Sequence, residues 1–137
     1  MIVRSRRNRF LRRGGAAVEM AVITPVLVTL LFGIIEYGWL FTVRQALVAG
    51  AREGARAASL PGSTVSEVEQ RVSGRMQTLG LSGYTTSVTT DPNDPTSPSG
   101  RVTVTIPYAQ VSLLGHFFGH TTGDMDAAAE FRNENSD

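Results

Sequence analysis

The fold of this chain is decided by residues 14–60, which read GGAAVEMAVITPVLVTLLFGIIEYGWLFTVRQALVAGAREGARAASL. No residue between Glu19 and Glu36 carries a charge. A helix over 20–43 would be about 36 Å long at about 1.5 Å per residue. That length spans a hydrocarbon layer of about 30 Å with a modest tilt. We therefore predict one long helix whose first part, within 15–43, crosses a membrane.

A basic leader precedes this helix, because residues 1–14 contain arginines and no acidic residue, although the whole chain has a formal net charge of only +1. A basic arm can bind nucleic acid, but no aromatic-rich basic groove or recognition motif accompanies this one. Arginines beside an apolar run are better explained by the positive-inside rule, which holds them in the cytoplasm. We expect no nucleic-acid partner and assign the leader to membrane topology. Its arginines are Arg4, Arg6, Arg7, Arg9, Arg12 and Arg13.

The far end of the span carries Tyr37, Trp39 and Phe41, where an aromatic belt is expected at the outer interface. This predicts a single pass with the N-terminus inside and the C-terminal domain outside. Glu36 lies just before these aromatics. Its carboxylate either reaches the headgroup region or pairs with an arginine or amine of a neighbouring subunit, because an unpaired charge deep in a membrane is costly.

Residues 44–60 are predicted to continue the helix beyond the membrane as a stalk, ended by the Pro-Gly pair that follows. Small residues recur every four positions there and form a stripe that lets another helix approach closely. The stalk could pack on its own soluble domain or on a helix of another subunit, and the sequence favours neither. The stripe consists of Ala46, Gly50, Gly54 and Ala58.

Residues 61–137 are predicted to form a small α+β domain. A helix is expected over 63–79, because Thr64 and Glu67 form a capping box before an apolar periodicity. Glu67 and Arg71 have the spacing of an ion pair on one helix face. The expected apolar face consists of Val65, Val68, Val72, Met76 and Leu79.

Alternating residues predict three strands, at 84–90, 101–107 and 122–131. The proline-rich segment 91–100 is expected to be a long, exposed hairpin loop. One helix on a roughly three-stranded antiparallel sheet makes a two-layer unit. The apolar residues of 110–120 fit the core best, and an exposed patch that contacts membrane or partner is the alternative. They are Leu113, Leu114, Phe117 and Phe118.

No residue pattern predicts catalysis. His116 and His120 have a helical spacing, but a zinc site needs further ligands and no glutamate lies between them. Asp91, Asn93 and Asp94 resemble part of a calcium loop that prolines interrupt. The chain has no cysteine. We expect no metal, no cofactor and no enzyme activity.

The arginines followed by Gly14-Gly15-Ala16-Ala17-Val18-Glu19-Met20 resemble a class III (type IVb) prepilin signal. In that family a membrane prepilin peptidase cuts after a glycine, and a glutamate lies at the fifth position of the product. The resemblance implies a cut between Gly14 and Gly15, because only this cut puts Glu19 at that position. Met20 departs from the family, which commonly has an aromatic residue there.

The new α-amine would be mostly protonated at neutral pH, because such groups have a pKa of about 7.7–8.0. It could pair with Glu19 of the same or an adjacent subunit, and each charge would lower the cost of the other in the membrane. Glu19 is thus expected to act in assembly and registry.

The longer pattern GAAVEMAVITPVLVTLLFGIIEYG, followed by RQALVAGAREGARAAS, is similar to TadE-like proteins, the minor pilins or pseudopilins of tight-adherence (Flp) pilus systems. The resemblance implies a structural protein of the bacterial inner membrane that can enter a pilus. Its implied partners are the prepilin peptidase, the major pilin, other minor pilins, the assembly platform and membrane lipid. The rival hypothesis is a permanently anchored assembly or binding factor with an uncleaved leader.

Overall fold

The computed structural model describes residues 8–90, 99–115 and 122–132, and for 8–13 the backbone only. The chain divides into two compact units between Tyr37 and Gly38. Each unit is described by itself below.

The first unit contains the N-terminal part of helix α1, which runs from Asn8 to Ala58. All residues from Gly14 to Ile35 are exposed, and the helix is long and apolar enough to cross a membrane. The helix continues through Pro25, and the hydroxyl of Thr29 donates to the Pro25 carbonyl at 2.8 Å. Membrane helices tolerate a proline inside the span.

The start of α1 differs from the prediction. We expected the helix to begin at Gly14, but it begins at Asn8, within the arginine-rich leader. Arginine is a good helix former, and an established helix propagates at little cost into neighbouring residues. The predicted single long helix is otherwise confirmed to Ala58.

The second unit contains the rest of α1 together with helix α2, Val65–Gln77. The predicted capping box is confirmed: the Thr64 side chain accepts from the Glu67 N–H, and the Glu67 carboxylate accepts from the Thr64 N–H. The predicted Glu67–Arg71 pair is wrong, because the Glu67 carboxylate serves the cap and Arg71 lies near Glu53 of α1. Val65 and Leu79 also lie outside the buried face, which is limited to Val68, Val72 and Met76.

Three antiparallel strands form a sheet in the order β1-β2-β3, as expected. The strands are β1 (Thr85–Val88), β2 (Ser99–Pro107) and β3 (Asp124–Arg132). The register sets Val102 opposite Ala129 and Val104 opposite Ala127, so apolar residues share one face. On the other face Arg101 lies opposite Glu130, and their side chains pair at 2.7 Å.

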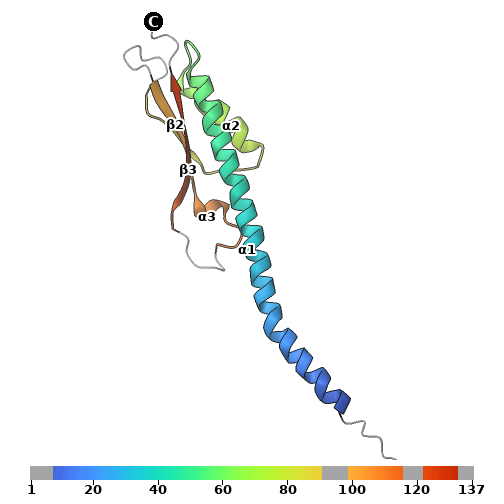
Figure 1. Ribbon diagram of the computed structural model, residues 1–137. Coiled ribbons are helices and arrows are strands. Elements are labelled where there is room, and N and C mark those ends of the chain that lie inside the picture. The colour runs from blue at the N-terminus through green and yellow to red at the C-terminus, as the bar shows by residue number, and fades with distance from the viewer. Residues whose placement is uncertain (1–7, 91–98, 116–121, 133–137) are drawn as a thin grey trace, which may run out of the picture. The chain divides into compact units, whose positions relative to one another are not determined.

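The core lies between this apolar sheet face and the helices α1 and α2 (Figure 1). Its largest fully buried side chains come from all three elements, which makes the unit a two-layer α+β structure. They are Leu47 and Val43 of α1, Val68, Val72 and Met76 of α2, and Val102, Val104 and Ile106 of β2.

A short helix that the sequence did not reveal, α3 (Tyr108–Val111), follows β2 directly. Val111 is buried, but Leu113 is 58% exposed, so the expectation that Leu113 belongs to the core is wrong. Phe117 and Phe118 lie outside the described residues.

Candidate functional site

The Gly14-Gly15 pair and Glu19 lie on the exposed N-terminal part of α1. A Cβ at either glycine would meet nothing within 4 Å. Since Gly15 and Glu19 are one helical turn apart, they lie on the same face of α1. The helix surface at the glycine pair and the Glu19 carboxylate are therefore both exposed to another protein at this point.

The structure describes only some of the other charged residues that the sequence singled out. Arg4, Arg6 and Arg7 lie outside the described residues, whereas Arg9, Arg12 and Arg13 lie on α1. Glu36 is half-buried and takes part in an interaction within the chain. Its role between subunits stays a prediction.

The small-residue stripe of the predicted stalk is buried in the second unit of the same chain. Gly50 faces Met76 and Val72 of α2, and Gly54 faces Val72, Val68 and Val102. Ala46 is 8% exposed and Ala58 is fully buried. Of the two alternatives for this stripe, the structure shows packing against its own domain.

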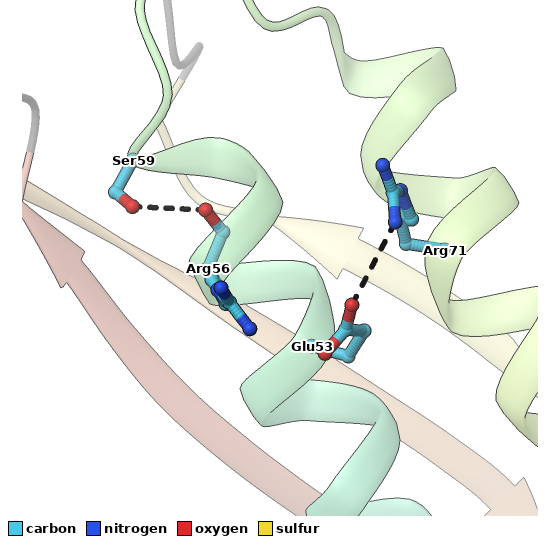
Figure 2. A network of polar contacts seen from close by, with 4 residues as sticks. All are labelled: Glu53, Arg56, Ser59 and Arg71. Atoms are coloured by element: carbon cyan, nitrogen blue, oxygen red, sulfur yellow. Dashed lines mark hydrogen bonds and ion pairs between the residues drawn. The ribbon is translucent and has the colours of Figure 1, made fainter.

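Charged residues lie at the edge of this helix interface (Figure 2). The Arg71 guanidinium of α2 is 3.9 Å from the Glu53 carboxylate of α1, and both side chains are more than a third exposed. The Ser59 hydroxyl donates to the Arg56 carbonyl at 2.9 Å near the end of α1. Such an exposed pair contributes at most about 1 kcal/mol, so apolar packing holds α2 on α1.

Trp39 makes a contact that sequence reasoning missed. Its indole Nε1–H donates to the Val111 carbonyl at 2.7 Å, which ties α3 to α1 across 72 residues of sequence. The sequence assigned Trp39 to an aromatic belt only. No sequence signal identifies a backbone carbonyl as the indole acceptor, because any residue supplies one.

An open groove of about 770 Å³ lies between α2 and the start of β1. Most of its lining residues carry a hydroxyl or amide group, and Glu69 contributes a carboxylate. Among the described residues no group of three histidine, cysteine or acidic side chains could hold a metal ion. His116, His120, Asp91, Asn93 and Asp94 lie outside those residues.

In the comparison with known proteins, the sequence model of the family "TadE-like protein" matches residues 14–56. This confirms the resemblance over the exposed apolar part of α1 and over the part of α1 that follows it, as far as residue 56. No curated protein and no solved structure matches the chain.

TadE-like proteins are structural components of Tad pili rather than enzymes, and this chain is similar to them over residues 14–56. The N-terminal apolar helix fits a single-pass membrane protein of such a system. The matched segment begins at Gly14, so it includes the glycine pair and Glu19, and of the small-residue stripe it includes Ala46, Gly50 and Gly54.

Proposed function

We propose that this protein is a TadE-like minor pilin or pseudopilin of a Tad (Flp) pilus system. A prepilin peptidase cuts it between Gly14 and Gly15, and the product joins the major pilin and other minor subunits at the inner-membrane assembly platform. The observation that carries the proposal is the family match over 14–56, on a helix that is exposed from Gly14 to Ile35.

The exposed apolar surface supports a membrane or filament location. A soluble chain rarely leaves a contiguous apolar face of this extent in water. Lipid covers such a face in the membrane, and neighbouring helices cover it in a filament.

The glycine pair supports processing at this position. Because α1 begins at Asn8, a peptidase must open helical turns before it can reach the Gly14-Gly15 bond. Each glycine weakens a helix by about 1 kcal/mol relative to alanine. Neither glycine has a side-chain neighbour, so no tertiary contact opposes this local opening.

Removal of the leader then leaves Gly15 as the first residue of the helix. Its ammonium group and the Glu19 carboxylate lie one turn apart, and a carboxylate in the first turn is also favoured by the helix dipole. The pair can form within one chain or between neighbouring subunits. In either case the ammonium and carboxylate groups are paired in the low-dielectric layer, so neither charge is isolated there.

The test is the intact mass and N-terminal sequence of the protein from its native membrane, with and without the prepilin peptidase. We expect a chain that begins at Gly15 only when the peptidase is present. A chain that begins at Met1 in both samples would favour the permanently anchored assembly factor. Gly15→Ala keeps a small residue after the Gly14-Gly15 bond but removes the glycine that weakens the helix. It therefore serves as the control for the contribution of helix weakening to cleavage.

A further inference from the structure

The free edge of strand β3 lies beside a groove that carries arginines without acidic partners. The sheet order β1-β2-β3 leaves one long side of β3 without a strand partner among the described residues. The groove, of about 350 Å³, lies between the end of β3 and the last two turns of α1. We propose that an extended, acidic segment of another protein binds here as a fourth strand of the sheet. The inference goes beyond the proposed function and depends on the second unit alone.

The register identifies the backbone groups that face this edge. The Tyr108 N–H donates to the Gly123 carbonyl at 3.0 Å, directly beside the Pro107–Asp124 pair that ends the ladder. In an antiparallel ladder, hydrogen-bonded pairs alternate with pairs that are not hydrogen-bonded. Every second residue from Gly123 onward therefore bonds to β2, and the residues between them direct their N–H and C=O away from it. These outward-facing residues are Asp124, Asp126, Ala128, Glu130 and Arg132.

This edge is long and regular enough to template another strand. β3 has nine residues, against four in β1, and its register with β2 runs without a bulge. It contains no proline. An exposed strand edge pairs readily with another extended chain, because the two exchange main-chain hydrogen bonds. An extended peptide backbone is thus the chemistry that fits the edge.

The arginines indicate the charge of the partner. Arg52 and Arg56 are one turn apart on α1, and Arg132 ends β3. All three are exposed and line the groove, and within the described parts of the chain none of them forms an ion pair. Glu130 also lines the groove, but Arg101 already holds its carboxylate at 2.7 Å. Guanidinium groups bind carboxylates through paired hydrogen bonds, so an acidic segment complements this surface.

An added strand would present alternate side chains to the two faces of the sheet. Ala127 and Phe131 of β3 are buried on the helix side, and residues that lie opposite each other in a sheet share a face. Every second side chain of the new strand therefore points to the α1 side, where it meets Arg52 and Arg56. The residues between them supply the N–H and C=O groups that bond to β3. A segment with acidic residues at alternate positions thus satisfies the edge and the arginines together.

The probe for this site is a synthetic peptide of alternating glutamate and valine, blocked at both ends. One control is the same peptide methylated on its valine nitrogens, which keeps the charge but removes the donors to β3. The other control is a lysine–valine peptide of the same length. Binding to the full chain in a non-ionic detergent is measured by the fluorescence anisotropy of a dye on the peptide.

Amide hydrogen exchange, resolved by NMR, reports on the strand itself. We expect the glutamate peptide to bind and to slow exchange at the outward-facing amides of Asp126, Ala128 and Glu130, because their N–H groups become hydrogen-bonded. Neither control peptide should do so.

Arg52→Gln and Arg56→Gln test the charged side of the groove. We expect each to weaken binding of the glutamate peptide by about two- to fivefold, as for the loss of one exposed ion pair. Arg75→Gln makes the same charge change at an exposed residue of α2 that does not line the groove, and should leave the affinity unaltered.

Failure of the glutamate peptide to bind would overturn the inference, and so would equal binding of the lysine peptide. Equal affinity for the methylated peptide, or binding without slowed exchange on β3, would mean that the arginines attract polyanions and that no strand is added. Slowed exchange on β1 in place of β3 would put the segment at the other edge of the sheet and contradict this site. None of these outcomes bears on the membrane span or the leader cut of the proposed function.

Discussion

Gly54 of α1 lies so close to Val102 of β2 that a Cβ at position 54 would be 3.0 Å from Val102 Cγ1. The same Cβ would be 2.9 Å from Val72 Cγ2. Both valines are fully buried and are stiff at χ1, so neither can move away easily. This glycine therefore allows α1 to touch the helical and sheet parts of the core at once.

We expect Gly54→Ala to destabilise the second unit by about 1–3 kcal/mol, because overpacking outweighs the gain in helix propensity. Gly50→Ala should cost less, since its Cβ would meet the mobile end of Met76 at 2.6 Å. Urea unfolding of the full chain in detergent, followed by Trp39 fluorescence, measures the difference.

Gly74→Ala is the control on α2. A Cβ at position 74 would meet nothing within 4 Å, so this variant should be more stable than the wild type by up to about 1 kcal/mol. Equal stability of the Gly54→Ala variant and the wild type would show that α1 packs less tightly than described.

Thr64→Ala should lower the free energy of unfolding by about 1 kcal/mol, because it removes the acceptor for the Glu67 N–H at the start of α2. Thr64→Ser should retain most of the stability. Thr78, whose hydroxyl donates to the Gly74 carbonyl, offers a matched control at the other end of α2, and Thr78→Ala should change stability by less than about 0.5 kcal/mol. If Thr64→Ala and Thr78→Ala lose the same stability, the capping box contributes no more than the hydrogen bond of Thr78 at the other end of α2.

Trp39→Phe keeps a ring but removes the donor to the Val111 carbonyl. We expect a loss of about 0.5–1.5 kcal/mol, together with faster amide hydrogen exchange over 108–112, because α3 then loses its hydrogen bond to α1. Hydrogen-exchange mass spectrometry of the full chain measures this. Phe41→Leu, a change at an exposed neighbour on α1, should leave exchange in 108–112 unaltered. Unchanged exchange in Trp39→Phe would mean that packing alone positions α3.

Glu19→Gln tests the role of the carboxylate in assembly. We expect cleavage to continue and incorporation into membrane complexes or pili to fall by more than about tenfold, because an unpaired ammonium group in a low-dielectric layer costs several kcal/mol. Quantitative immunoblotting of sheared filaments and membranes, with the N-terminal sequence, separates the two steps. Glu36→Gln removes a carboxylate from the same helix and serves as the comparison. The role of Glu19 is wrong if its variant is cleaved and incorporated like the wild type.

Much of this molecule follows from local sequence pattern. A long uncharged run specifies a helix and its exposed apolar surface, Thr64 and Glu67 specify the start of α2, and residues alternating along each strand specify the faces of β2 and β3. These features depend on neighbours within a few positions, so they can be read without knowing what packs against them. The match over 14–56 is equally a property of the sequence alone.

Tertiary structure decided which partner each surface meets. The stripe of Ala46, Gly50, Gly54 and Ala58 could have packed on another subunit, but the structure buries it in the second unit of the same chain, with Gly50 against α2 and Gly54 against α2 and β2. Arg71 could have paired with Glu67 along its own helix, but the cap engages Glu67 and Arg71 lies by Glu53. The Trp39 indole donates to the Val111 carbonyl, which lies 72 residues away in the sequence. Periodicity fixes which residues share a face, whereas the choice of partner depends on how helices and sheet close over one core, and that is a property of the whole second unit.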